Sequence, residues 1–551
     1  MDNFKGFPTL IAMEQDRVIV IGAGMGGLAA AIRLAASGLK VTVLEAAATP
    51  GGKARAIPSP AGPVDTGPTV LTMRHVFDAL FALNGERLDD HATLLPQRIL
   101  ARHWWPGSPA LDLTTDRAEN AENIRALAGP REAAAFLKFD ATAEALYQAF
   151  DAPVMQAARP DLPAIARAAL RKPALWPALL PGLSLHGWLK TQFRDPRLIQ
   201  LFARYATYVG GRPARSPAVL SLIWRAEARG VWAVEGGMHH LATALAALAE
   251  RMGVTFRYGT PATRIQRQNG HVTGVQIADG RTLPCTSVVF NGDPAALTEG
   301  RMGTAAAASL PRKAAHPRSL SALVWAFASE ARGDKAPHLT HHNLFFTANP
   351  EAEFGPIGQG RMPEAPTLYL CAEDRIRDPR ARAMSVPVAD PASGPASDPA
   401  FGPERFEIIL NAPAGLPALR PEDFQKCRQI TFDRLARMGL TLTPPGPEAL
   451  STPATLDRLF PASGGAIYGR SPEGMMASFQ RPPARTALPG LYLAGGGAHP
   501  GAGVPMAALS AKHAAEAIMQ DRISASKSAP TAMPGGISTA SPTTGAARSR
   551  S

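Results

Sequence analysis

The stretch from Val18 to Gly27 constrains the fold more than any other part of the chain. It begins with four apolar, mostly β-branched residues, a pattern typical of a buried parallel strand. Glycines follow at once in the order G-x-G-x-x-G, at Gly22, Gly24 and Gly27. The first glycine permits a tight turn, the second lets backbone approach a pyrophosphate, and the third lets the next helix pack closely on the strand.

A helix and a second strand complete a β-α-β unit after these glycines. Apolar residues recur with helical spacing from Leu28 to Ala35, and the strand Val41–Leu44 ends in Glu45. Glu45 stands 18 residues beyond Gly27, close to where this motif places the acid that binds ribose hydroxyls. The free N–H groups and dipole at the helix N-terminus favour bound phosphate. We therefore predict that Gly22, Gly24, Gly27 and Glu45 bind a dinucleotide.

Composition narrows the class of protein further. The 551 residues suffice for two domains, and the three cysteines are widely spaced, which indicates neither a disulfide framework nor zinc and fits a reducing cytosol. The net charge of +12 fits either a solvated surface or attraction to anionic lipid. No motif points to nucleic acid, no run of about 20 apolar residues predicts a spanning helix, and residues 1–16 lack a secretory pattern.

The pattern along the chain predicts an α/β fold in which the nucleotide domain is split. Met13 is a candidate natural start, and we expect a Rossmann-type domain interrupted by an α+β domain for substrate and membrane contact. The predicted segments are an N-terminal extension (1–13), nucleotide-binding parts (14–79, 230–298, 456–520), substrate parts (80–229, 299–455) and a disordered tail (521–551). We expect residues 80–225 to be largely helical and residues 386–401 to form a loop.

The segment Leu162–Lys190 combines apolar, aromatic and basic residues. Pro173, Pro177 and Pro181 forbid one straight helix through it. Such a segment fits a part that dips into a membrane interface, and a helical hairpin buried in the protein is the alternative. We predict contact with a membrane surface here.

A second glycine-rich element lies near the other end of the chain, from Gly495 to Met506, after the strand-like Leu491–Leu493. A flavin needs an ADP-binding unit and further backbone around its ring, so two distant elements favour FAD. The Gly51-Gly52 pair allows close backbone approach. Lys53 and Arg55 are candidates to meet phosphate or flavin oxygens, with solvated charges on a surface turn as the alternative.

Together these motifs, with Asp65-Thr66-Gly67-Pro68-Thr69, the Gly236-Gly237 segment and Ala498–Pro505, resemble the carotenoid and phytoene desaturases. These form a branch of the flavin amine oxidase superfamily, and the resemblance covers about residues 14–520. The residues around Ala498–Pro505, together with 367–375 and 465–470, are more similar to the hydroxyneurosporene (methoxyneurosporene) desaturases of purple phototrophic bacteria than to phytoene desaturases.

The resemblance implies an FAD-dependent 3,4-desaturase of long acyclic 1-hydroxycarotenoids in spheroidene-type biosynthesis. A hydride would leave an allylic carbon for flavin N5 and a neighbouring proton would be lost, with quinone or oxygen as electron acceptor. The enzyme would be cytoplasmic and peripherally attached to the inner, photosynthetic membrane. Besides the four residues named first, the implied cofactor-binding residues are Gly52, Lys53, Gly67, Ala262, Gly496, Gly503, Val504 and Met506.

Catalytic groups are harder to name because neither hydrogen is appreciably acidic, so orientation in an apolar tunnel matters more than a strong base. Arg204 and Tyr208 are candidates, with ordinary packing as the alternative. His499 either touches the ring edge or caps a turn. His341-His342 has no third ligand at a metal-like spacing, so no metal is predicted. Other readings are a phytoene-type desaturase, a flavin-dependent carotenoid isomerase and a non-catalytic carotenoid-binding protein.

Overall fold

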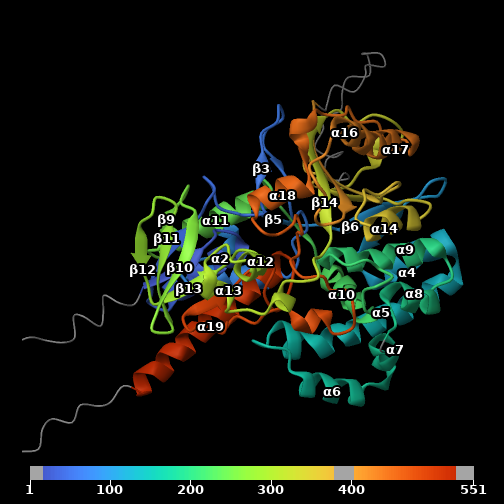
Figure 1. The fold of residues 1–551 in the computed structure, drawn as a ribbon. Coiled ribbons are helices and arrows are strands. Elements are labelled where there is room, and N and C mark those ends of the chain that lie inside the picture. The colour runs from blue at the N-terminus through green and yellow to red at the C-terminus, as the bar shows by residue number, and fades with distance from the viewer. Residues whose placement is uncertain (1–16, 181, 378–401, 529–551) are drawn as a thin grey trace, which may run out of the picture.

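The computed structural model describes residues 17–180, 182–377 and 402–528. The predicted N-terminal extension, Met13 and the predicted loop 386–401 lie outside these residues. A parallel sheet forms the centre of one half of the molecule (Figure 1). Its order is β19 (Leu491–Leu493), β13 (Ser287–Phe290), β1 (Arg17–Ile21), β2 (Lys40–Leu44) and β9 (Thr255–Arg257).

Strands from the beginning, middle and end of the chain therefore lie side by side in this sheet. Val20 pairs with Val289 on one side and with Val43 on the other, and all three are buried. Their β-branched side chains suit a strand that is covered on both faces. The predicted α/β class, with its nucleotide-type sheet assembled from separate segments, is confirmed.

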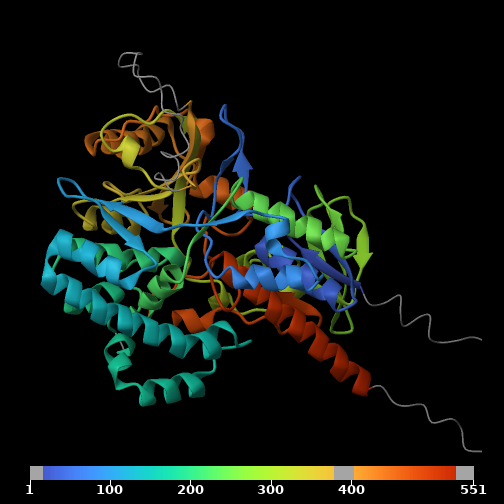
Figure 2. The same cartoon turned by 180° about the vertical axis from the view of Figure 1, so that it is seen from behind.

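Three helices cover this sheet: α2 (Met25–Ala36), α11 (Met238–Arg251) and α19 (Val504–Ser528). The long α19 packs against α2, which brings the two ends of the described chain together (Figure 2). Alanines on both helices are fully buried, so the helix axes can approach closely. The prediction of a disordered tail from residue 521 was wrong for residues 521–528, because they continue the helix of α19. The rest of that tail lies outside the described residues.

A mixed seven-stranded sheet forms the second half of the molecule. Its order is β18 (Leu450–Ser451), β14 (Ser321–Ser329), β17 (Glu404–Ala412), β16 (Leu368–Ala372), β15 (His342–Phe345), β6 (Ile99–Trp104) and β7 (Leu111–Thr114). The expectation that residues 80–225 are largely helical missed β6 and β7, and also β5 (Leu94–Pro96). β5 and β6 pair with strands far away in the chain, and β7 pairs with β6 in a hairpin. All three strands are short, so local periodicity does not reveal them.

The helical part lies below the second sheet, and α6 and α7 lie at its outer edge in both views (Figures 1 and 2). Its helices are α4 (Arg117–Ala128), α5 (Pro130–Phe150), α6 (Leu162–Arg171), α7 (Trp176–Leu179), α8 (Leu185–Gln192), α9 (Pro196–Ala203) and α10 (Leu222–Ala228). Among the described residues, no helix combines the length and the apolar character needed to cross a membrane.

Smaller elements complete the fold. They are the antiparallel strands β10 (Ala262–Gln268), β11 (His271–Ile277) and β12 (Thr282–Pro284), the strands β3 (Ala56–Ile57), β4 (Val64–Asp65) and β8 (Trp232–Val234), and the helices α3 (His75–Ala82), α12 (Pro294–Thr298), α13 (Thr304–Ala307), α14 (Glu351–Gly358), α16 (Pro421–Arg428), α17 (Arg434–Arg437) and α18 (Pro453–Leu459).

Candidate active site

The glycine turn between β1 and α2 leaves no room for side chains. A Cβ on Gly27 would lie 2.0 Å from the Gly22 carbonyl oxygen, and Gly22 itself has φ +98°. Asn291, at the end of β13, donates from its side chain to that same carbonyl at 3.1 Å. Asn291 was not singled out from the sequence as a site residue, because its role depends on a strand that pairs with β1 from the middle of the chain.

Glu45 lies at the end of β2, beside the glycine turn. Its carboxylate accepts hydrogen bonds from the Ala23 N–H at 2.6 Å and from the Ala47 N–H at 2.8 Å. The Thr260 N–H donates to the Glu45 carbonyl at 2.8 Å, which brings the start of β10, at Ala262, to the same end of the sheet. The three predicted contacts for the adenosine half of a cofactor, the glycine turn, Glu45 and Ala262, therefore share one edge.

The Gly51-Gly52 turn packs directly on the glycine turn. The Gly51 N–H donates to the Ala23 carbonyl at 2.8 Å, and a Cβ on Gly52 would lie 3.1 Å from the Gly24 Cα. Gly67 fits against the next residue of this turn, because a Cβ there would lie 2.0 Å from the Lys53 carbonyl oxygen. Close backbone approach, rather than side-chain chemistry, shapes this side of the site.

The charged ends of the Lys53 and Arg55 side chains form hydrogen bonds within the protein. The Lys53 ammonium donates to the Ile467 carbonyl at 2.7 Å, and burial lowers its pKa to about 8. The Arg55 guanidinium donates to the Ser451 hydroxyl at 2.7 Å. Lys53 therefore ties the turn to the loop that carries Ile467, and Arg55 ties it to β18, an edge strand of the second sheet.

The C-terminal glycine loop lies against the N-terminus of α2. A Cβ on Gly26 would lie 2.6 Å from the Gly495 nitrogen. The Gly496 carbonyl accepts a hydrogen bond of 2.7 Å from Arg481, a buried residue that the sequence analysis did not single out. Gly503, Val504 and Met506 follow and line a cavity together with Gly67.

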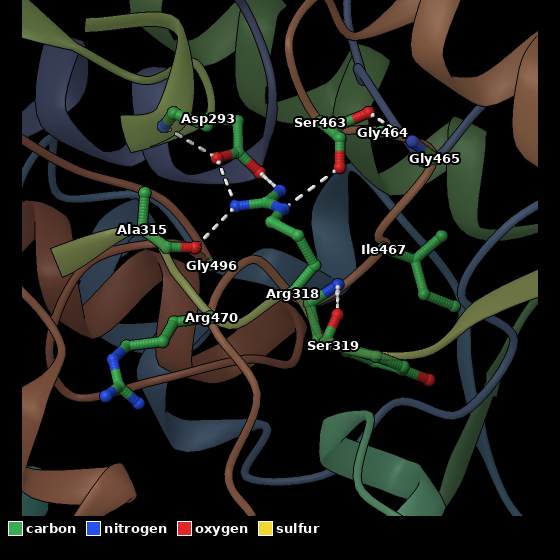
Figure 3. A network of polar contacts seen from close by, with 12 residues as sticks. Asp293, Ala315, Arg318, Ser319, Ser463, Gly464, Gly465, Ile467, Arg470 and Gly496 are labelled. Carbon is green, nitrogen blue, oxygen red and sulfur yellow. Dashed lines mark hydrogen bonds and ion pairs between the residues drawn. The ribbon is translucent and has the colours of Figure 1, made fainter. Parts of the chain in front are cut away.

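A buried ion pair holds the two sheets together beside this loop (Figure 3). Asp293 caps α12, accepting from the Ala295 N–H at 2.9 Å, and pairs with the Arg318 guanidinium. Arg318 also donates to the Ser463 carbonyl at 3.1 Å. The network joins the end of β13 to the chain entering β14 and to the loop that carries Ile467, so it fixes the anchor of Lys53.

The cavity has a volume of about 730 Å³ and a mainly apolar lining. Gly67 and the Gly501–Met506 loop line it, and so do Tyr147, Phe150 and Lys190 of the helical part. Its walls are the seven-stranded sheet on one side and α9 and α10 on the other. Such a cavity suits an elongated apolar molecule with one end beside the glycine loops.

Arg204 and Tyr208, the two candidate catalytic residues, both line the cavity and belong to one buried cluster. Arg204 pairs with Glu227 at 2.8 Å, and the Tyr208 hydroxyl donates to the other Glu227 oxygen at 2.5 Å. The carboxylate of Glu227 therefore neutralises the guanidinium, and burial raises the pKa of Tyr208 far above its usual range. This arrangement gives neither residue the form of a free base.

The carboxyl groups of Asp65, Glu373 and Glu407 lie close together behind Gly67, between β4 and the second sheet. Glu407 accepts from the Gly67 N–H at 2.6 Å, and Glu373 accepts from the Asp65 N–H at 2.8 Å. Burial raises the pKa of all three groups, that of Glu373 to about 8 and that of Glu407 well above its usual value. The hydrogen bond from Gly67 to Glu407 holds the Gly67 backbone in place.

The structure gives contacts for the histidines that the sequence singled out, His499 and the pair His341-His342. His499 bonds through Nε2 to the Ala157 carbonyl at 2.9 Å, and burial lowers its pKa to about 4, so it ties the C-terminal loop to the helical part. His341 and His342 are joined by Cys371, from the neighbouring strand, with ligand atoms within 4.8 Å of one another. Strand pairing supplies this third group, which sequence spacing could not show, but burial raises the pKa of the Cys371 thiol well above its usual range.

The chain belongs to the flavin-containing amine oxidoreductase family, whose model matches residues 25–341. It is 59% identical to a hydroxyneurosporene desaturase of Cereibacter sphaeroides over 93% of this chain and 99% of that protein. It is 57% identical to the hydroxyneurosporene desaturase of Rhodobacter capsulatus, with the same coverage. The protein is thus a flavin oxidoreductase, and the family resemblance inferred from the motifs is confirmed.

A solved oxidoreductase structure from Methanosarcina mazei shares the fold. The TM-score is 0.55 at 15% identity, covering 92% of this chain and 100% of that one. Flavin chemistry fits the site described above, because a cradle of glycines that admits no Cβ meets an apolar cavity at Gly67.

Proposed function

We propose that the protein is an FAD-dependent 1-hydroxycarotenoid 3,4-desaturase acting on 1-hydroxyneurosporene. The observation that carries this proposal is the mainly apolar cavity of about 730 Å³ whose lining includes Gly67 and the Gly501–Met506 loop. The names and high identity of the two bacterial relatives support the substrate class. FAD, rather than a smaller flavin, is favoured because the glycine turn and Glu45 provide a place for an adenosine diphosphate half.

The cofactor, when bound, supplies the hydride acceptor. The residues proposed to hold it are Gly22, Gly24, Gly27 and Glu45 on the adenosine side, with Ala262 beside them. Gly52, Lys53, Gly67, Gly496, Gly503, Val504 and Met506 are proposed to surround the ring. The apolar walls align the polyene and exclude water, and no strongly basic group is needed because alignment lowers the barrier. Quinone or oxygen is proposed to reoxidise the flavin.

We also propose that α6 and α7 rest on a membrane surface. Leu170 is 70% exposed and Trp176 50%, and Leu162 and Leu180 are about half exposed. Arg167 and Arg171 lie on α6 together with Leu162 and Leu170, and such a mixture of basic and apolar residues is typical of interfacial segments. The same helical part also lines the cavity, with Tyr147, Phe150 and Lys190. A polyene could therefore pass from the bilayer into the cavity without crossing water.

Product analysis tests the reaction. Purified holoenzyme is given 1-hydroxyneurosporene or phytoene, with a quinone or oxygen as acceptor. We expect a product two hydrogens lighter, with absorbance shifted to longer wavelength, from the hydroxylated polyene. Desaturation of phytoene alone would replace the proposal with a phytoene-type activity, and a product of unchanged mass would indicate an isomerase.

Vesicle binding tests the membrane contact. Leu170→Ser with Trp176→Ser should reduce co-sedimentation with anionic lipid vesicles at least about 10-fold, because two apolar side chains leave the interface. Ser substitution of Leu459, which is 47% exposed on α18, provides the control and should bind as the unaltered protein does. Equal binding by the double variant would overturn this contact.

A further inference from the structure

A hydrogen-bonded chain of three side chains crosses the sheet wall of the cavity. The Thr69 and Tyr369 hydroxyls lie 2.6 Å apart, and the Tyr369 hydroxyl lies 2.6 Å from Nδ1 of His342. Thr69 and Tyr369 line the cavity, whereas His342 lies behind them and is 1% exposed. The other ring nitrogen of His342, Nε2, is buried without a hydrogen-bond partner among the described residues.

The chain is uncharged. Burial lowers the pKa of His342 well below its usual value and raises that of Tyr369 well above its own. With one proton on the imidazole, the three groups can be arranged in two ways. If His342 carries its proton on Nδ1, a hydroxyl hydrogen at Thr69 is left free. If the proton is on Nε2, the Tyr369 hydroxyl donates to Nδ1 and the Thr69 hydroxyl donates to Tyr369, which leaves the Thr69 oxygen free to accept. The first arrangement needs an acceptor and the second a donor, and an alcohol can be either, whereas a hydrocarbon can be neither.

Arg204, Tyr208 and Asn411, which also line the cavity, already have partners. Arg204 and Tyr208, on the opposite wall, are bound to Glu227 at 2.8 and 2.5 Å. Asn411 donates to Glu353 at 2.8 Å. A guest hydroxyl at the sheet wall would therefore meet the Thr69–Tyr369 pair without breaking an ion pair.

The pair also lies where the proposed chemistry needs it. Thr69 is two residues from Gly67, and both line the cavity together with the C-terminal glycine loop. In a 1-hydroxycarotenoid the oxygen is attached to C1, and the bond to be oxidised joins C3 and C4. The hydroxyl is thus held within a few bonds of the reacting carbons, so the group that recognises it must lie near the glycine loops.

We propose that Thr69, Tyr369 and His342 bind the tertiary hydroxyl of the substrate and so select hydroxylated polyenes over unsubstituted ones. The inference rests on the proposed function and names the part of that site which reads the hydroxyl. Tyr369 and Thr69 are the specificity-determining residues, and His342 positions the Tyr369 hydroxyl.

The test compares kcat/KM for 1-hydroxyneurosporene with kcat/KM for 1,2-dihydroneurosporene, which has the same saturated C1–C2 bond but no hydroxyl. Tyr369→Phe and Thr69→Val should each lower the ratio of these two values at least about 10-fold, because a site built to hydrogen-bond a hydroxyl loses its advantage over the plain hydrocarbon. The loss should fall on the hydroxylated substrate. Ile409→Val, on the neighbouring strand of the same wall, is the control and should shift both substrates together.

Flavin content and melting temperature are measured for each variant to recognise a misfolded protein. If Tyr369→Phe or Thr69→Val misfolds, the test uses the one that folds. An unchanged ratio in a folded Tyr369→Phe or Thr69→Val protein overturns the inference while the proposed function stands. An equal fall in the ratio for Ile409→Val also overturns it. If the unaltered enzyme fails to desaturate 1-hydroxyneurosporene, the proposed function itself fails, and the hydroxyl site fails with it.

Discussion

The cofactor cradle is shaped by backbone contacts, whereas the cavity is shaped by side chains. In the cradle, glycines bring backbone against backbone, as where a Cβ on Gly27 would meet the Gly22 carbonyl. In the cavity, side chains from two layers make the walls, and a buried Arg204–Glu227 pair sits within one of them. Changes to the cradle should therefore act on cofactor binding, whereas changes to the cavity should act on stability and selectivity.

The largest effect is expected when one partner of the buried pair in the cavity wall is removed. Arg204→Met leaves the Glu227 carboxylate buried without its cation, which should lower the free energy of unfolding by about 3–5 kcal/mol. Urea unfolding measures this change. Arg281→Met, at an exposed pair with Asp279, is the control and should leave the unfolding midpoint where it was. Similar midpoints for the two variants would contradict a structural role for the cavity pair.

A smaller and different effect is expected in the cradle. Gly24 has extended backbone, which alanine also adopts, but its Cβ would lie 3.0 Å from the Asn291 side chain, beside the turn proposed to hold phosphate. Gly24→Ala should therefore reduce bound flavin per chain at least about 10-fold, which corresponds to about 1.4 kcal/mol. Flavin absorbance relative to protein measures it. Gly402→Ala, where no atom lies near the new Cβ, should keep its flavin. Full flavin content in Gly24→Ala would contradict the proposed role of the glycine turn in cofactor binding.

A pH-dependent effect is expected at the border between the two regions, where Glu373 lies behind Gly67. The folded protein holds the Glu373 proton up to a pKa of about 8, whereas the ordinary value is 4.5. Between these values the folded state binds more protons than the unfolded chain, so the free energy of unfolding falls as pH rises. The fall is at most about 1.4 kcal/mol per pH unit.

Unfolding of the unaltered protein and of Glu373→Gln at pH 6 and at pH 8, about the window just given, separates this contribution. The unaltered protein should lose more stability than the variant between the two values. Parallel losses would show that Glu373 is ionised at both.

The same contrast explains how much could be predicted from the sequence. Gly22, Gly24, Gly27 and Glu45 were recognisable because their roles depend on local order along a β-α-β unit. The split sheet followed from the second glycine element. Asn291, by contrast, acts from a strand that joins β1 only in three dimensions.

The cavity was less accessible to sequence reasoning. Thr69 lies in a motif that was noticed, and Tyr369 in a segment that carried the subfamily resemblance, but their contact joins residues 300 positions apart. Arg204 and Tyr208 were candidates for catalysis because the sequence does not show that both contact Glu227. Pairing across strands and between layers leaves no periodic trace, so side-chain partners of this kind needed the structure.

The position of β19 has a consequence for how the protein is made. This edge strand pairs with β13 and leads into α19, which packs on α2, yet it is among the last parts to leave the ribosome. At about 5–20 residues per second, β1 and α2 wait on the order of half a minute to a minute and a half for these partners. Until β19 and α19 emerge, the nucleotide sheet lacks an edge strand and a covering helix, so apolar surface on β13 and α2 stays exposed on the nascent chain.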